Sequence, residues 1–153
     1  MSRQIRPGFV LAALLAPVLL PAVVYFVAAF ASGLGPVGSV EALLEQSFGG
    51  RPSPVTTGLL GLFPALLLLG GIFLARRLWP QAEWIQAAGW GGLGALLIVL
   101  AWANFEVWPL FLPGRSFPGF PHGIELVIGP LIFGPVAILV GAAFLGILAG
   151  IRS

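Results

Sequence analysis

Hydrophobic residues along the chain gather into four long runs, and the stretches between the runs hold nearly all of the charged residues. The runs cover about residues 9–31, 57–75, 85–103 and 123–151. A helix needs about 20 apolar residues to cross the ~30 Å hydrocarbon core of a bilayer, and each run has about that length or more. The sequence therefore predicts an all-α integral membrane protein, with four transmembrane helices in one up-and-down bundle that forms a single domain over residues 1–153.

Prolines interrupt three of the four runs. They are Pro17 and Pro21 in the first run, Pro64 in the second, and Pro130 and Pro135 in the fourth. A proline lacks the amide hydrogen and leaves the carbonyl four residues earlier without its helical partner, so a kink is expected at each. Such kinks either fit the helices to their neighbours or form ion and substrate sites, as broken helices do in transporters. We favour the first interpretation because no line of polar residues accompanies the kinks.

The first run also resembles the core of a signal peptide. Arg3 and Arg6 precede it, and Ala29-Phe30-Ala31 provides a small-x-small cleavage pattern. A signal core has about 7–15 apolar residues, however, and this run is longer. We therefore expect a retained transmembrane helix.

The arginines predict how the bundle is oriented. If both termini lie on one side of the membrane, that side carries five arginines and the other side carries two. The two sets are Arg3, Arg6, Arg76, Arg77 and Arg152 on the first side, and Arg51 and Arg115 on the second. Because positive residues concentrate on the cytoplasmic side, we expect both termini in the cytoplasm and the chain in a bacterial cytoplasmic (inner) membrane.

A fifth, shorter helix is predicted over about residues 40–48, between the first two spans. Ser39 could cap its start, and Gly49-Gly50 could end it. Its apolar side chains share one face at helical spacing: Val40, Leu43, Leu44 and Phe48. An amphipathic helix of this kind is expected to lie in the outer interface or to pack on the bundle.

Composition excludes several classes of protein. Hydrophobic residues make up 59% of the chain and charged residues only 8%, which is too few to cover a soluble fold of 153 residues. The absence of cysteine excludes disulfides, thiol chemistry and cysteine metal sites. The net charge of +2 forms no basic patch, so nucleic acid is not expected as a partner.

Candidate chemistry gathers near the start of the fourth run. The polar residues there are Asn104, Glu106, Arg115, His122 and Glu125. His122 and Glu125 are three residues apart, so on a helix they would share a face. This set could hold a divalent metal, relay a proton or bind a quinone oxygen, and His122 could ligate a haem or pigment metal. The alternative is a solvated polar cluster at the interface, bridged by Arg115.

Small residues repeat every four positions in the last two runs. The ladders are Ala87, Gly91 and Ala95 in the third run, and Ala142, Gly146 and Gly150 in the fourth. Such ladders let helix backbones approach closely in lipid. They predict helix contacts either within the bundle or with another chain.

The four apolar runs contain very few polar or charged residues, and this scarcity determines the function that we expect. We expect a small, non-catalytic accessory subunit of a larger membrane complex, such as a respiratory or photosynthetic assembly. It would pack through its small-residue faces and through the aromatic, proline-rich outer segment 104–122, in contact with membrane lipid and other subunits. One alternative is a homo-oligomeric transporter or channel that uses Glu125 or Glu106. Another is a membrane enzyme that acts on lipid or quinone through Glu106, His122 and Glu125.

Overall fold

A computed structural model describes residues 5–50, 52–115 and 123–151, and these residues form helices joined by turns. The elements are α1 (Pro7–Ala29), η1 (Phe30–Leu34), α2 (Gly35–Phe48), α3 (Pro54–Leu78), α4 (Trp84–Val107), η2 (Trp108–Phe111), α5 (Glu125–Ile128), η3 (Gly129–Phe133) and α6 (Gly134–Ile151). Four helical segments are long and apolar enough to cross a membrane: Pro7–Phe48, Pro54–Leu78, Trp84–Phe111 and Glu125–Ile151. The four expected spans are therefore confirmed as long apolar helices, as in an integral membrane protein.

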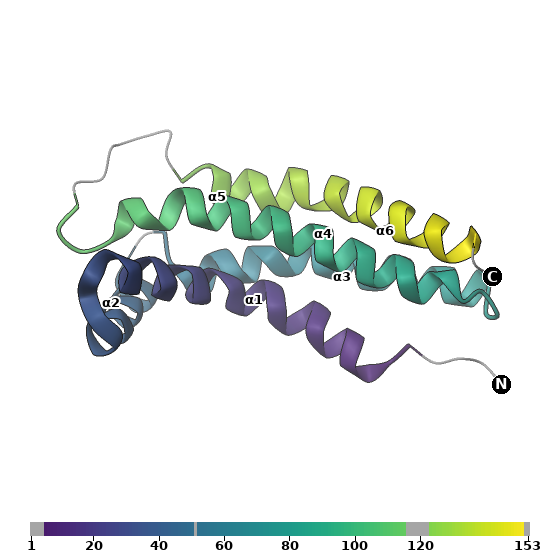
Figure 1. The fold of residues 1–153 in the computed structure, drawn as a ribbon, viewed down its shortest axis with the longest axis horizontal. Helices are drawn as coiled ribbons and strands as arrows, with labels where there is room; N and C mark the ends of the chain where they lie inside the picture. Colours follow the sequence, from purple (N-terminus) through teal and green to yellow (C-terminus); the bar gives the residue numbers. More distant parts are fainter. Residues whose placement is uncertain (1–4, 51, 116–122, 152–153) are drawn as a thin grey trace.

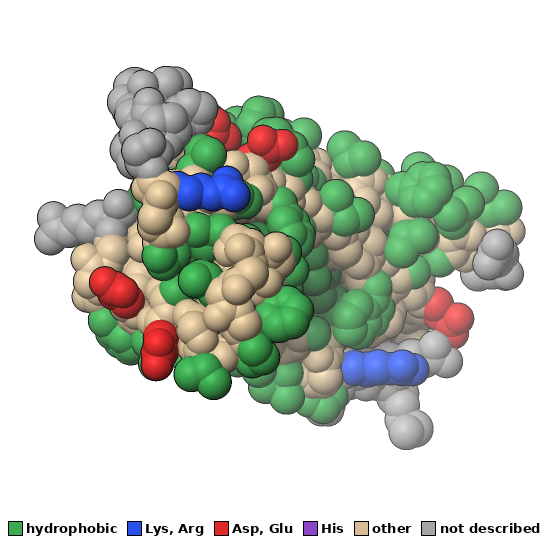
Figure 2. All heavy atoms as spheres, turned by 60° about the vertical axis from the view of Figure 1, so that its left-hand side comes forward, with side chains coloured by type: hydrophobic (Ala, Val, Ile, Leu, Met, Phe, Trp, Pro, Cys, Tyr) green, Lys and Arg blue, Asp and Glu red, His purple; other side chains and the backbone are tan. Residues whose placement is uncertain are grey.

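The four long helices lie side by side and alternate in direction along the chain (Figure 1). The start of α1 and the end of α6 lie at one end of the bundle, together with the short turn between α3 and α4. Helix α2, η2 and the start of α5 lie at the opposite end, which we call the α2 end. Hydrophobic side chains cover the flank of the bundle, and the charged side chains on this face lie near its two ends (Figure 2). This distribution is typical of a helical membrane bundle.

Helix α2 is longer than the sequence predicted. It begins at Gly35 rather than near Val40, because Pro36 occupies the first turn, where a proline is well tolerated. Ser39 is therefore not an N-cap: its hydroxyl lies inside the helix and donates to the Gly35 carbonyl over 2.6 Å. Gly49 follows the last helical residue, as expected.

The break between α1 and α2 depends on glycine. Gly33 has a φ of 94° and Gly35 a φ of 70°, values that a residue with a Cβ rarely adopts. The chain turns there, and α2 packs on the bundle through buried Ser39 and Ala42. Its predicted apolar face points largely away from the bundle, with Val40, Leu44 and Phe48 exposed.

The interior of the bundle contains two hydrophobic clusters. The larger extends from the start of α1 and α4 to the middle of the helices and includes Phe9, Ala13, Leu68, Ile85, Leu93, Leu96, Leu100 and Ile138. The second lies at the α2 end and includes Val24, Tyr25, Ala29, Ala42, Val107, Trp108, Leu112 and Leu126. The larger cluster is wholly apolar, whereas the second contains the hydroxyl of a tyrosine and the indole of a tryptophan.

Helices α4 and α6 make the closest approach, at two glycines that face each other. A Cβ added to Gly91 would clash with the carbonyl oxygen of Gly141, and a Cβ added to Gly141 would clash with that of Gly91. Ala95 borders this contact, since its Cβ lies 2.6 Å from the position of a Cβ added to Gly141. The two backbones thus touch with no side chain between them, which is the geometry that small residues permit in membrane helices.

The other members of the two ladders lie at different distances from this contact. A Cβ added to Gly146 would lie 3.4 Å from the Cβ of Ala88, whereas one added to Gly150 would meet nothing within 4 Å. Ala87 and Ala142 are half-buried. The tightest α6 position is therefore Gly141, which precedes the first residue of the predicted ladder.

The prolines lie inside the bundle, and the chain adjusts around them. Pro17, Pro21 and Pro64 are buried. Pro21 leaves the carbonyl of Pro17 without a helical amide, and Gly61 of α3 packs against that carbonyl, with an added Cβ only 3.2 Å from the oxygen. Around Pro130 the helix widens into η3, where the amide of Gly134 donates to the carbonyl of Gly129, five residues back. The prolines thus shape helix contacts within the bundle.

Candidate functional site

Asn104 is the one member of the predicted polar set that is buried among the described residues, at 2% exposure. Its amide nitrogen donates to the carbonyl of Leu100 over 2.7 Å, and its amide oxygen accepts from the indole N–H of Trp108 over 2.5 Å. Both partners belong to the same helix or its continuation into η2. Asn104 therefore supports the aromatic ring of Trp108.

The charged members of the set lie nearer the surface. Glu106 and Arg115 are exposed, and Glu125 is half-buried. A carboxylate oxygen of Glu125 accepts from the backbone amide of Gly123 over 2.9 Å, a local bond at the start of α5. His122 lies outside the described residues. Within the described ranges no three His, Cys, Asp or Glu side chains come together as a possible metal site.

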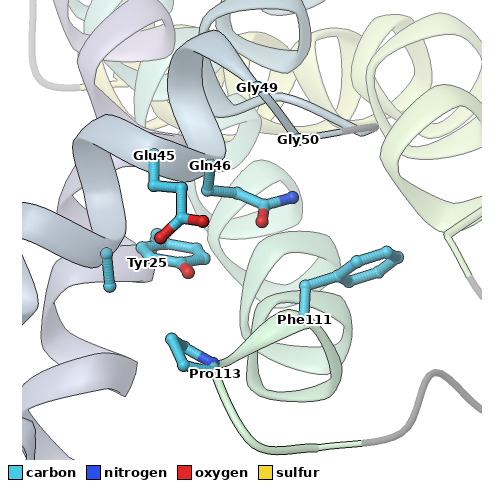
Figure 3. Close-up of a pocket in the computed structure, with 8 residues that line it drawn as sticks. Tyr25, Glu45, Gln46, Gly49, Gly50, Phe111 and Pro113 are labelled. Atoms are coloured by element: carbon cyan, nitrogen blue, oxygen red, sulfur yellow. The ribbon is translucent and has the colours of Figure 1, made fainter.

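The structure instead places a cavity of about 310 Å³ at the α2 end of the bundle. It opens between α1, α2 and the segment that follows η2 (Figure 3). Its lining residues are Tyr25, Ala42, Glu45, Gln46, Gly49, Gly50, Phe111 and Pro113. Three of them carry polar side chains, and these come from two separate helices, α1 and α2.

Tyr25 forms the deepest polar wall of this cavity. Its side chain is 1% exposed, and its ring packs edge-to-face on Trp108 with centroids 5.6 Å apart. Figure 3 shows its hydroxyl directed into the space between Glu45 and Pro113. A hydroxyl that faces a cavity can both donate a hydrogen bond to a ligand and accept one from it.

Glu45 and Gln46 come from the last turn of α2. The Gln46 amide donates to the carbonyl of Pro52 over 2.7 Å, and the Ser53 hydroxyl donates to the carbonyl of Ser47 over 2.7 Å. These two bonds fasten the end of α2 to the start of α3. Glu45 is exposed and presents its carboxylate at the rim of the cavity.

Aromatic rings connect the floor of the cavity to its far wall. Trp108 lies between Tyr25 and Phe111, with the Trp108 and Phe111 ring centroids 6.0 Å apart in an edge-to-face arrangement. Edge-to-face pairs of this kind add to the stability that burial alone provides. The chain of contacts Asn104, Trp108, Tyr25 and Phe111 therefore makes this end of the bundle a defined polar-aromatic site.

The sequence pointed to Asn104 but not to the cavity above it. Tyr25 stood alone in an apolar run, and Glu45 had the spacing of a solvent-facing residue on an amphipathic helix. Two signals were present: an acidic residue in the last turn of a helix, where basic residues are normally favoured, and an Asn and a Trp four residues apart at the end of a span.

The chain matches no protein-family model, no curated protein and no solved structure.

Proposed function

We propose that this chain is a small, non-catalytic accessory subunit of a larger membrane complex, for example a respiratory or photosynthetic assembly. One observation carries the proposal. Among the described residues, the buried polar side chains besides Tyr25 and Trp108 are Ser39, Ser53, Thr57 and Asn104, and all four lie in α2, around the start of α3 or near the end of α4. The larger interior cluster of the bundle is apolar.

This distribution argues against conduction through a single copy of the chain. A pathway for ions or polar solutes is lined by polar groups across the bilayer. Here the centre of the bundle holds the apolar cluster around Leu68, Leu96 and Ile138. The backbone contact between Gly91 and Gly141 closes the space between α4 and α6.

The outer surface of the bundle supports contact with other subunits. Gly70 and Gly71 on α3 and Gly94 on α4 are exposed, and a Cβ added to any of them meets nothing within 4 Å. Exposed glycines allow a neighbouring helix to approach closely in lipid. We therefore infer that partner helices pack on this surface in the assembled complex.

We further propose a bacterial cytoplasmic membrane, with both termini in the cytoplasm. The short turn at the terminal end supports this orientation because Arg76 and Arg77 end α3 there. Arg76 donates from Nη1 to the carbonyl of Ala82 over 2.9 Å, and the rings of Trp79 and Trp84 lie 6.3 Å apart beside it. Arginine and tryptophan together are typical of a membrane interface.

Gentle detergent extraction at native abundance, followed by native mass spectrometry, tests the proposal. We expect the chain to be recovered with other proteins in fixed stoichiometry. Recovery only as a homo-oligomer would contradict an accessory role and would favour a transporter or channel. A parallel extraction from cells that overproduce the chain serves as a control, because an excess of the chain over its partner subunits would itself yield the chain without them.

A further inference from the structure

Glu45 places a negative charge at the cavity of the α2 end, and none of the other described lining residues carries a positive charge. Glu45 is the only formally charged side chain among its eight lining residues. Glu45 also lies in the last turn of α2, which contains no basic residue. The end of a helix carries a partial negative charge, so a carboxylate there adds to that charge instead of neutralising it. The site is thus electrostatically complementary to a cation.

The other walls favour an organic cation over a metal ion. Calcium and magnesium take about six or more oxygen ligands, whereas this cavity offers one carboxylate, one amide and one hydroxyl. Tyr25 contributes an aromatic ring to the wall, and aromatic rings attract ammonium groups. The buried Tyr25 hydroxyl has lone pairs to accept an N–H bond. An anion such as free phosphate would meet the Glu45 carboxylate and no positive side chain among the described lining residues.

We propose that this cavity binds an organic ammonium group beside Glu45 and Tyr25. The volume of about 310 Å³ corresponds to roughly ten water molecules at about 30 Å³ each, which is enough for an ethanolamine or choline group. The site lies at an end of a membrane bundle, so its ligand comes either from the headgroup of a zwitterionic lipid or from a free amine at the membrane surface. The proposal is independent of whether the chain is an accessory subunit.

The test uses the full-length protein in nanodiscs of phosphatidylglycerol, to which phosphatidylethanolamine is added as the lipid probe and ethanolamine as the free probe. Binding is measured by native mass spectrometry and by calorimetry. We expect the wild type to bind at least one of the two probes, and Glu45→Gln to weaken that binding by about tenfold through loss of a charge-assisted contact. Tyr25→Phe, which removes only the hydroxyl, should weaken binding by about threefold.

Glu41→Gln is the matched control. Glu41 is an exposed glutamate one turn before Glu45 in the same helix, and it does not line the cavity. Its replacement should leave binding unchanged, which separates the cavity from general negative charge on α2. Thermal unfolding of each variant in the same nanodisc checks that the fold is retained.

The outcomes distinguish a lipid headgroup from a free amine as the source of the ammonium group, and they also include results that would contradict the proposal. Binding of the lipid without binding of ethanolamine assigns a headgroup site, and binding of ethanolamine assigns a site for free amines. No binding of either probe would overturn the proposal. Equal losses in Glu45→Gln and Glu41→Gln, or undiminished binding in a folded Glu45→Gln variant, would overturn it as well.

Discussion

The indole N–H of Trp108 donates to the side-chain oxygen of Asn104, one turn earlier, over 2.5 Å. This bond holds Trp108 at the point where α4 ends and η2 begins. Tyr25 packs edge-to-face on the ring so positioned, with a centroid distance of 5.6 Å. One buried hydrogen bond within a helix therefore sets the floor of the cavity that opens between α1 and α2.

Asn104→Leu should destabilise the protein by about 1–3 kcal/mol because the buried indole N–H would lose its acceptor. Reversible unfolding in detergent, followed by circular dichroism, measures the loss. Trp108→Phe removes the same hydrogen bond from the other side. The double variant should therefore lose less than the sum of the two single variants, with a coupling of about 1 kcal/mol. Additive losses would show that the bond contributes nothing of its own.

Gly91→Val should separate α4 from α6, because its side chain would enter the space filled by the Gly141 backbone. Overpacking typically costs about 1–3 kcal/mol, and the obstacle here is backbone that cannot rotate away. Gly94→Val in the same helix is the control, since a Cβ there meets nothing within 4 Å. The melting temperature of the purified chain should fall for the first variant and stay nearly constant for the second. Equal effects would mean that helix propensity, not the contact, is responsible.

Two glycines near the start of α2 should respond to alanine with opposite signs. Gly35 has a φ of 70°, so Gly35→Ala forces a residue with a Cβ into a strained conformation and should destabilise by about 1 kcal/mol. Gly38 lies inside the helix, and a Cβ there would meet only the Cβ of Leu34 at an ordinary 3.6 Å. Gly38→Ala should therefore stabilise by about 0.5–1 kcal/mol. Chemical unfolding of both variants decides the signs, and matching signs would exclude a backbone origin.

Orientation can be tested with single cysteines because the natural chain has none. Glu41→Cys in α2 and Gln81→Cys in the α3–α4 turn place exposed thiols at opposite ends of the bundle. With both termini cytoplasmic, a membrane-impermeant maleimide added to intact cells should label the first and not the second. Permeabilised cells, in which both should react, provide the control. The reverse pattern would invert the orientation inferred from the arginines.

Transport by the isolated chain can be tested directly. Vesicles that contain the purified protein should show the same proton and cation flux as protein-free vesicles, since the centre of the bundle is apolar. Glu125→Gln should change nothing in this assay. Flux that depends on Glu125 would contradict the accessory role and support a transporter. Flux that persists in the Glu125→Gln variant would assign a pathway elsewhere in the chain.

The spans and the end of α2 were predictable because they depend on local sequence. About 20 apolar residues in succession are sufficient to specify a membrane helix, and Gly49 ends α2 where the sequence suggested. The start of α2 was predicted wrongly, because Ser39 resembles an N-cap whereas the helix continues back to Pro36 and Gly35. Whether α2 lies in the outer interface stays a prediction, as does the chemistry assigned to Glu106, His122 and Glu125.

The sequence by itself determined how many segments are long and apolar enough to span a membrane and where charge is scarce, since these properties follow from runs of neighbouring residues. Tertiary structure alone decided which glycine of α6 meets Gly91, because the register of two helices depends on how both surfaces pack. It also decided that Tyr25 and Glu45, twenty residues apart in two helices, line one cavity. The chain turn at Gly33 and Gly35 brings those two side chains to the same cavity. The residue pattern of neither helix predicts that they would lie near each other.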